Sequence, residues 1–415
     1  MTTVAVPNRL GPADLRRWPQ LSPPHPAPVR SALARIFLRR AAATAGICVH
    51  CFGEGRLGRT DGPVLAIHDP AAFYARLGRS GKIGFGESFM AGEWSSPDLV
   101  GLLEALARQA DSLVPRPLQV FRRWFDAAHP RAEDNDREGA ARNIVRHYDL
   151  SNELFATFLD ESMTYSSALF TDRRVALGEA QIHKIERLLD ATGVRSGTRL
   201  LEIGTGWGEL ALRAARRGAR VTSITLSKEQ AALARRRVVM EGLADVVDVR
   251  VQDYRDVEGT YDAILSVEMI EAVGERWWPA YFRTLERCLA PEGRVGLQAI
   301  TMAHERLLAT KASWTWVHKY IFPGGLVPSE QALSETMARN TRLEVVDRLA
   351  FGQSYAETLA CWQDRFAKRA AEVERLGFDE TFRRMWSFYL AYSEAGFRSG
   401  YLDVVQLVLR RSAPG

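Results

Sequence analysis

A glycine-rich turn follows an apolar run between residues 200 and 208. The run Leu200-Leu201-Glu202-Ile203 leads into Gly204-Thr205-Gly206-Trp207-Gly208, and a helical pattern comes next. Glycines allow positive φ and let a ligand approach the backbone at the carboxyl edge of a parallel sheet. A dinucleotide site would show G-x-G-x-x-G with an acidic residue about 20 positions later, but Ile224-Thr225-Leu226 offers no carboxylate. No G-K-[ST] follows, which argues against a nucleoside triphosphate.

The spacing G-x-G-x-G instead resembles the first motif of the class I S-adenosylmethionine methyltransferases. Gln252-Asp253-Tyr254 lies just past the third apolar run, where this superfamily recognises the adenine edge. A glycine turn alone is a weak signal, because many α/β proteins have one for packing reasons. The turn and the Gln252-Asp253-Tyr254 segment together favour a methyl-donor site.

Longer stretches resemble one family closely, the cyclopropane-fatty-acyl-phospholipid synthases with their mycolic-acid and methylene-branching relatives. The stretches that carry the resemblance are residues 84–94 (GFGESFMAGEW), 147–152 (HYDLSN), 163–170 (MTYSSALF), 225–230 (TLSKEQ), 269–274 (MIEAVG) and 319–329 (KYIFPGGLVPS). Several long motifs in the same order are far more specific than one short pattern. The chain is therefore identified as a member of this family over residues 80–410.

The resemblance implies transfer of the sulfonium methyl to the cis double bond of an unsaturated acyl chain in membrane phospholipid. An alkene is a poor nucleophile, so the protein must align the donor with the π bond. The resulting carbocation must be shielded from water, and aromatic faces stabilise positive charge. Five aromatic residues are candidates for this role: Trp314, Trp316, Tyr320, Phe322 and Tyr355. Most of them could equally be core residues, so we assign the role only to Tyr355.

The family resemblance also implies a bound bicarbonate as the base that removes the final proton. The positions that would hold it are Ser167, Glu271, Gln298, Ile300 and Tyr355. Ser167 and Gln298 replace the family's cysteine and histidine; both can hydrogen-bond an oxyanion, but glutamine cannot take up a proton. Glu268 adds a carboxylate where many relatives have glycine. These departures leave the product open between a cyclopropane and a methylene branch.

The donor itself, S-adenosyl-L-methionine, is expected to contact residues from four parts of the chain. The resemblance implies contacts over the methionine end, at the glycine turn, near the ribose and near the adenine. The expected contact residues are Tyr165, Ser166, Glu202, Gly204, Gly206, Gly208, Thr225, Leu226, Gln230, Gln252, Asp253 and Tyr254. Gln230 would replace the usual acidic partner of the ribose hydroxyls. Thr225 and Gln230 also suit capping at a strand end and a helix start, and both roles can coexist.

Apolar runs alternate with helical patterns from Thr198 onward, which predicts a doubly wound α/β domain. The expected fold is a Rossmann-like, seven-stranded class I methyltransferase sheet with a smaller, partly helical N-terminal domain. The expected strands are Arg199–Gly204, Arg220–Thr225, Val247–Val251, Ala263–Val267, Arg294–Thr301, Leu343–Leu349 and Tyr401–Leu409. The expected helices are Trp207–Arg217, Ser227–Gly242 and Arg276–Leu289.

Composition shifts divide the chain into four segments. Five prolines between Trp18 and Pro28 favour an extended tail, so residues 1–28 are expected to be loosely held. Residues 29–125 would form an N-terminal lipid-docking domain, and the polar stretch 126–142 a linker. Residues 143–415 would form the catalytic domain, with an acyl-chain-binding insertion around 302–330.

Positive charge is concentrated at the N-terminal end. The first 60 residues hold nine arginines against Asp14 and Glu54, a sum of +7, so the overall +5 leaves −2 for the rest. Leu33, Ile36 and Phe37 recur at helical spacing among arginines, which is typical of a helix on an anionic membrane and also of one docked on its own domain. No apolar run suits a signal peptide or a spanning helix, so we expect a cytoplasmic protein peripherally associated with the inner membrane face.

The composition is that of a globular protein, with 46% hydrophobic and 25% charged residues. Four cysteines do not make a disulfide framework, and Cys48-Val49-His50-Cys51 lacks the second pair of a zinc site, so we expect no metal. The expected partners are an anionic phospholipid surface and an unsaturated acyl chain, with no nucleic acid, and the resemblance is compatible with a homodimer. Two alternatives stay open: an O- or N-methyltransferase of a small molecule, and a non-enzymatic membrane-binding module.

Overall fold

The computed structural model describes residues 11–59, 61–109, 127–128, 135–137, 139–140, 151–172 and 174–413. These residues divide into two compact units. The first unit contains the described residues up to position 129, with Ala312–Ile321 and Trp362–Tyr401. The second unit contains those from 130 to Lys311, Phe322–Cys361 and the residues from Leu402 onward. Most of the expected linker 126–142 and residues 147–150 of the HYDLSN motif lie outside the described residues.

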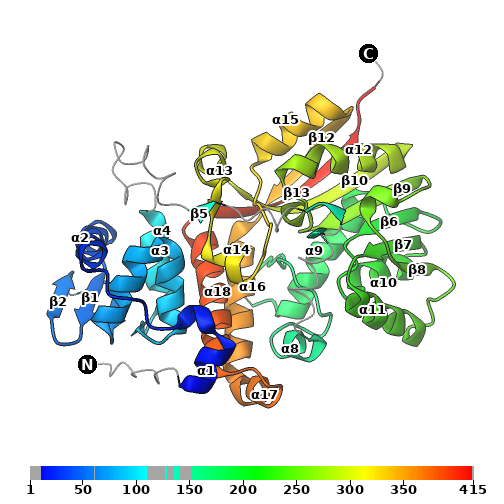
Figure 1. Cartoon of the computed structure of the whole chain (residues 1–415). Helices are drawn as coiled ribbons and strands as arrows, with labels where there is room; N and C mark the ends of the chain where they lie inside the picture. Colours follow the sequence, from blue (N-terminus) through cyan, green and yellow to red (C-terminus); the bar gives the residue numbers. More distant parts are fainter. Residues whose placement is uncertain are drawn as a thin grey trace. The chain divides into compact units, whose positions relative to one another are not determined.

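The second unit is built on a seven-stranded sheet with the order β12-β13-β10-β9-β6-β7-β8 (Figure 1). Its strands are β6 (Arg199–Ile203), β7 (Arg220–Thr225), β8 (Val247–Val251), β9 (Tyr261–Val267), β10 (Leu289–Met302), β12 (Leu343–Ala350) and β13 (Leu402–Arg411). β13 is antiparallel to both of its neighbours, and the other pairs are parallel. The expected seven-stranded α/β fold is confirmed, because each strand arises from one of the predicted apolar runs.

Helices cover both faces of this sheet, because successive residues of a strand point to opposite faces. In β6, Leu200 belongs to one buried cluster and Leu201 to the other. One face is covered by α9 (Leu177–Ala191), α10 (Glu209–Arg216) and α11 (Lys228–Met240), and the other by α12 (Trp278–Cys288) and α15 (Glu330–Asn340) (Figure 1). The shorter helical elements of this unit are α8 (Asn152–Ala156), η3 (Tyr254–Asp256), η4 (Ile270–Ala272), η5 (Glu275–Trp277) and α13 (His304–Thr310).

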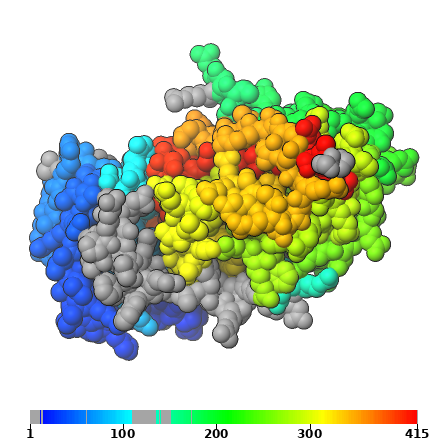
Figure 2. Space-filling model, turned by 90° about the horizontal axis from the view of Figure 1, so that it is seen from above, coloured from blue at the N-terminus to red at the C-terminus, as the bar shows by residue number. Residues whose placement is uncertain are grey.

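The chain leaves β6 toward β7 on one side and later returns to place β9 on the other. Such a reversal of strand order opens a crevice at the carboxyl ends of the strands, where ligands bind in doubly wound folds. At the far edge β12 is mostly exposed, and Figure 2 shows the orange residues of α15 and β12 beside the red residues of β13. The sheet therefore positions its site beside β6, away from this edge.

The first unit combines helices with a four-stranded sheet of order β2-β1-β3-β4. Its strands are β1 (Cys48–Cys51), β2 (Gly55–Gly58), β3 (Val64–Ile67), β4 (Trp94–Ser95), and the pair β5 (Ala127–Ala128) and β11 (Ser313–Trp314). Its helices are α1 (Pro12–Arg17), η1 (Pro19–Leu21), α2 (Pro28–Ala45), α3 (Pro70–Met90), α4 (Leu99–Arg108), α14 (Trp316–Tyr320), α17 (Ala370–Arg375) and α18 (Glu380–Arg398). α16 (Gly352–Lys368) starts in the second unit and ends in the first.

Side chains in residues 11–28 are mostly exposed, but the segment makes specific contacts where the prolines predicted a loose tail. Arg76 is 4% exposed, and its guanidinium donates to the backbone carbonyls of Leu21 and Ser22, besides pairing with Glu93. Trp18 Nε1 donates to Asp379 at 3.0 Å. The buried cation needs acceptors, and the proline-rich backbone supplies them because its carbonyls are not used in a helix or sheet.

The aromatic residues considered for the reaction are divided between the two units. Within the first unit Trp316 packs against Phe388 with ring centroids 4.8 Å apart, and the Tyr320 hydroxyl donates to Glu87 at 2.8 Å. The segment 312–321, expected to be part of an insertion in the catalytic domain, thus contributes to the core of the first unit. Phe322 and Tyr355 belong to the second unit.

Candidate active site

The glycine turn after β6 forms one wall of a pocket. Gly204, Gly206 and Gly208 have φ values of 100°, 52° and 93°, a left-handed backbone that other residues adopt only at a cost. A Cβ built on Gly206 would meet no atom within 4 Å, so its missing side chain leaves open space on the pocket side. Gly208 packs on Ala234 and begins α10.

A second wall comes from the segment that precedes α9. Lys184, fully buried on α9, donates from Nζ to Ser166 Oγ at 2.7 Å, and Gln181 donates to the Ser166 carbonyl at 2.9 Å. Burial lowers the pKa of Lys184 to about 8, against the opposing charges of nearby carboxylates that include Glu268. Burial also raises the pKa of Glu202, on β6, to about 8. Both Lys184 and Glu202 line the pocket.

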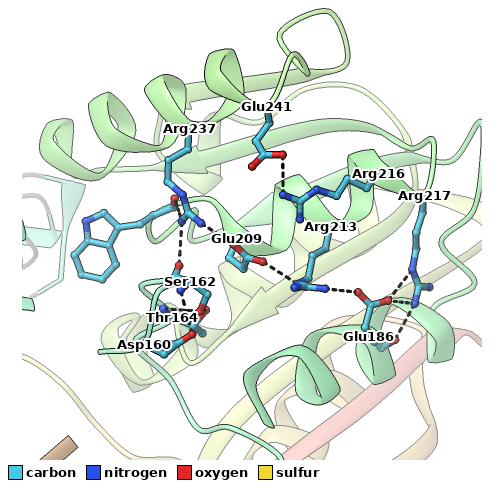
Figure 3. A network of polar contacts seen from close by, with 11 residues as sticks. Asp160, Ser162, Thr164, Glu186, Glu209, Arg213, Arg216, Arg217, Arg237 and Glu241 are labelled. Atoms are coloured by element: carbon cyan, nitrogen blue, oxygen red, sulfur yellow. Dashed lines mark hydrogen bonds and ion pairs between the residues drawn. The ribbon is translucent and has the colours of Figure 1, made fainter. Parts of the chain in front are cut away.

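Arginine side chains tie these walls together (Figure 3). Arg237 on α11 donates to the carbonyls of Ser162 at 3.0 Å and Trp207 at 2.8 Å, and pairs with Glu209 at 2.7 Å. Glu209 also pairs with Arg213 at 2.8 Å. The guanidinium of Arg237 therefore connects the Ser162–Ser166 segment to the residues that follow the glycine turn.

Nearly all predicted donor contacts surround this one pocket. The residues that line it among them are Tyr165, Ser166, Glu202, Gly204, Gly206, Thr225, Leu226, Gln230, Gln252 and Tyr254. Gly208 and Asp253 do not line it, and the Asp253 carboxylate pairs instead with Arg255 at 2.7 Å. The Thr225 hydroxyl donates to Gln230 Oε1 at 2.9 Å. The N-cap of α11, a role considered for Thr225 and Gln230, is provided by Ser227. Sequence reasoning missed Lys184, whose signal was a lysine on an apolar helix face.

A carboxylate stands in this pocket at Glu268, directly after β9. Its Oε1 accepts from the Ser167 backbone N–H at 2.9 Å and from Gln298 Nε2 at 2.8 Å. Its Oε2 accepts from the Tyr355 hydroxyl at 2.7 Å. Glu268 has a φ of 49°, the left-handed region in which glycine is at ease. Three donors thus hold one carboxylate, on a strained backbone, at the pocket wall.

These contacts decide whether bicarbonate fits the predicted anion site. Three of its expected ligands, Ser167, Gln298 and Tyr355, already direct donors at Glu268. Glu271 Oε1 accepts from the Ile300 backbone N–H, and its Oε2 is buried without a hydrogen-bond partner among the described residues. A resident bicarbonate does not fit these side chains, because the donors expected to hold it already bond to Glu268 and Glu271.

The two carboxyl groups differ in how they are stabilised. Desolvation, and after it the charge of Glu268, raise the pKa of Glu271 to about 8. Desolvation also raises the pKa of Glu268, but hydrogen bonds from Tyr355, Ser167 and Gln298 and the charge of Lys184 oppose the shift. The three hydrogen bonds favour the carboxylate form of Glu268, whereas Glu271 accepts one backbone hydrogen bond, feels the charge of Glu268 and is favoured in its neutral form.

Comparisons with known proteins agree with this geometry. The family model described as mycolic acid cyclopropane synthetase matches residues 135–407. The chain belongs to this family. It is 51% identical over 413 residues to tuberculostearic acid methyltransferase UfaA1 of Mycobacterium tuberculosis, covering 97% of each chain. It is 32% identical over 341 residues to the cyclopropane-fatty-acyl-phospholipid synthase of Escherichia coli, covering 82% of this chain and 86% of the relative.

A solved mycolic acid cyclopropane synthase, CmaA1, complexed with SAH and CTAB, shares 30% identity and a TM-score of 0.61. The alignment covers 65% of this chain and 98% of that one. As a member of the mycolic acid cyclopropane synthetase family, the chain is an S-adenosylmethionine-dependent methyltransferase that modifies fatty acyl groups. The predictions of family, fold and enzyme class are confirmed.

Two further expectations concern metals and membranes. Cys48 and Cys51 lie three positions apart on β1, so their side chains point to opposite faces, and both are buried free thiols. Within the part of the chain that the structure describes, no cluster of His, Cys, Asp or Glu could hold a metal ion. Among the same residues, no helix is long and apolar enough to cross a membrane.

Proposed function

We propose that this family member methylates the cis double bond of an unsaturated acyl chain in membrane phospholipid, with Glu268 as the base. The observation that carries the proposal is the carboxylate of Glu268, held by Ser167, Gln298 and Tyr355 at the wall of the donor pocket. A methyltransferase acting on oxygen or nitrogen of a small molecule would need no base for a carbon-bound proton. A non-enzymatic module would need neither the pocket nor the base.

Atoms and charges balance in the proposed steps when the residues of this chain act on the methyl donor and the acyl chain. S-adenosylmethionine supplies an electrophilic methyl group when it is bound. Its transfer breaks the sulfur–carbon bond, forms a carbon–carbon bond to one alkene carbon and leaves positive charge on the acyl chain. Glu268 then accepts a proton from the transferred methyl group, and a neutral hydrocarbon product remains. Because Glu268 is a weakly nucleophilic carboxylate held by three hydrogen bonds, it removes the proton without capturing the cation.

We propose a methylene branch as the product. If the methyl C–H electrons bond to the cationic carbon, a cyclopropane closes. If a hydride first shifts from the methyl-bearing carbon to the cationic carbon, loss of the methyl proton leaves an exocyclic methylene group. Two observations favour the branch: the anion site is rebuilt around Ser167, Gln298 and Glu268, and the 51% identical relative is named a methyltransferase, not a ring-forming synthase.

The experiment combines purified protein, a trideuteromethyl donor and vesicles of a phospholipid deuterated at both alkene carbons. A carbon methylation that ends in loss of a methyl proton retains two of the three donor deuterons, whereas an O- or N-methyl product retains all three. In the branched product one chain deuteron moves to the neighbouring carbon, and in a cyclopropane both stay in place. Retention of both in ring carbons contradicts the proposed branch, and no labelled acyl chain contradicts the function.

We further propose that the first unit docks on an anionic membrane through α2. The inner side of this helix buries Leu38 and Ala42, while the outer side exposes Val29, Leu33 and Ile36 by 73%, 60% and 63%. An exposed apolar stripe of this kind marks an interaction surface. Exposed arginines lie on the same helix at Arg30, Arg39 and Arg40, and Arg56 is exposed on β2. A second copy of this chain docked through the same face would bring arginines against arginines. An anionic lipid surface instead complements these charges and contains the proposed substrate.

A further inference from the structure

Two buried glutamines connect Glu268 to an arginine outside the pocket. Gln298 on β10 and Gln406 on β13 are register partners and are fully buried. Arg187 on α9 donates from Nη1 to Gln406 Oε1 at 2.8 Å. Gln406 Nε2 donates to Gln298 Oε1 at 3.0 Å, and Gln298 Nε2 donates to Glu268 Oε1 at 2.8 Å. One continuous hydrogen-bonded chain therefore runs from Arg187 to Glu268.

The direction of every bond in this chain follows from Arg187 at its outer end, and backbone carbonyls along the chain favour the same direction. A guanidinium only donates, so Gln406 must turn its oxygen toward Arg187. Its amide nitrogen then donates to Gln298 and also to the Lys184 carbonyl at 3.1 Å, which only accepts. Gln298 must in turn present its oxygen to Gln406 and its nitrogen to Glu268. The Ser167 carbonyl, which accepts from Gln298 Nε2 at 3.4 Å, favours the same orientation from the pocket side.

We propose that Arg187 is a positioning residue that, through Gln406 and Gln298, keeps a hydrogen-bond donor directed at Glu268. This inference rests on the proposed role of Glu268 as the base. A donor at Glu268 Oε1 favours the carboxylate form, and an acceptor in its place would repel it. Hydrogen bonds in such a chain polarise one another, so the cation at one end strengthens the donor at the other. Asp347 on β12 holds the guanidinium from outside at 2.6 Å.

Other charged and titratable groups act on Glu268 directly and are unchanged by substitutions in the chain. They are Lys184 on α9, Glu271 in η4 and Tyr355 on α16. The hydrogen bonds of Arg187 and Gln406 reach Glu268 through the amide of Gln298. A carboxylate at position 406 would also act on Glu268 through space. The Arg187 variants add no carboxylate and therefore carry the test of the hydrogen-bonded chain.

Three variants test the direction of the bonds. Gln406→Glu has nearly the same shape but only accepts when it pairs with Arg187, so Gln298 must turn its oxygen toward Glu268. Arg187→Met removes the cation that orients Gln406, whereas Arg187→Lys keeps a group that only donates. Arg199→Met is the matched control, because Arg199 is also partly exposed and paired with an aspartate, Asp262, at 2.8 Å.

Two measurements report the ionisation of Glu268. One is the acid limb of the pH profile of kcat. The other is a pH titration of the carboxylate infrared bands, taken as the difference from Glu268→Gln. We expect Gln406→Glu and Arg187→Met to move both to higher pH by about one unit or more. Arg187→Lys and Arg199→Met should retain the wild-type values. Wild-type titration in Gln406→Glu, or equal shifts in Arg187→Met and Arg187→Lys, would overturn the inference. The infrared titration needs no turnover, so failure of the proposed reaction would be seen separately.

Discussion

The hydroxyl of Tyr355 donates to Glu268 Oε2 at 2.7 Å, although 87 positions separate the two residues in the chain. Tyr355 lies on α16, and Glu268 lies at the end of β9. The tyrosine was expected to hold a bound anion, and it holds an anion that the chain itself provides. Because this contact uses the donor that bicarbonate would need, an internal carboxylate and a bound bicarbonate are alternatives at one site.

Replacing Glu268 with glycine should therefore make the reaction depend on bicarbonate. Glycine suits the φ of 49° at this position, so Glu268→Gly should fold well. The substitution leaves the donors of Ser167, Gln298 and Tyr355 without their acceptor. Loss of the base should lower kcat by about 100-fold or more. Added bicarbonate should restore part of the activity, measured as labelled acyl chains formed from vesicles.

Glu268→Gln is the control for this experiment, because its amide still fills the space and should leave no room for bicarbonate. The wild-type rate should not change when bicarbonate is removed from the buffer. A wild-type enzyme that stops without bicarbonate and recovers when it is added would show that Glu268 does not replace the ion.

Glu271 should affect stability more than turnover. Desolvation, and then the charge of Glu268, raise its pKa to about 8 in the folded protein, whereas an unfolded glutamate ionises near ~4.3. Its stabilising contribution is therefore complete below ~4.3 and is lost as the pH rises through about 8. Glu271→Gln cannot ionise, so its melting temperature relative to wild type should increase between pH 5 and pH 8.

Activity provides the second measurement on this variant. With Glu268 as the base, Glu271→Gln should lose less than about tenfold in kcat, far less than Glu268→Gln. If Glu271→Gln folds normally and is inactive while Glu268→Gln is active, the two roles are exchanged. A melting-temperature difference that is constant with pH would contradict the raised pKa.

The sheet and the donor turn could be predicted because their signals are local. Apolar runs of strand length and glycines at fixed spacing directly gave β6 to β9 and the pocket wall at Gly206. The carboxylate site could not be predicted in the same way. Glu268 was recognised as an added carboxylate, but its direction depends on one left-handed φ and on contacts from β10 and α16.

The extent of the two units was also hidden from the sequence. Composition placed residues 143–415 in one catalytic domain, whereas α18 belongs to the first unit. Composition does not state which core receives the apolar face of a helix. The proline-rich start was expected to be loose because prolines favour an extended chain, and composition does not show its hydrogen-bond partners. Arg76, more than 50 positions away, supplies them.

An extra side chain at Gly206 should block donor binding. The left-handed φ of 52° means that valine would strain the backbone, so asparagine, which tolerates this region, is the better probe. Gly206→Asn should abolish binding of S-adenosylmethionine in calorimetry, because the new side chain enters the pocket. Gly193→Asn, at an exposed glycine with φ of 73° and open space around it, controls for strain and should bind normally. Wild-type affinity in Gly206→Asn would exclude this turn as the donor site.

Removing Arg237 should weaken donor binding without removing the chemistry. Its guanidinium holds the carbonyls of Ser162 and Trp207, so Arg237→Ala should release the pocket segment from the glycine turn (Figure 3). Two hydrogen bonds from a charged donor predict a rise in KM for the methyl donor of roughly tenfold or more, with kcat at saturation little changed. Arg216→Ala, which breaks only the exposed pair with Glu241, should leave both constants unchanged. Equal effects of the two substitutions would assign Arg237 to general stability.

The outward face of α2 should decide whether the protein binds vesicles. The double variant Leu33→Ser/Ile36→Ser removes two exposed apolar side chains without touching the buried face of the helix. Each side chain that enters the bilayer contributes on the order of 1–2 kcal/mol, so partitioning onto anionic vesicles in a sedimentation assay should fall about tenfold or more. Val239→Ser/Met240→Ser, which removes similarly exposed apolar residues from α11, should sediment like wild type.

Wild-type binding should also weaken with added salt and on neutral vesicles, because the flanking arginines act through a screened field. Binding that ignores lipid charge and salt, or a double variant that converts a dimer into a monomer while still sedimenting with vesicles, would assign this face to another partner.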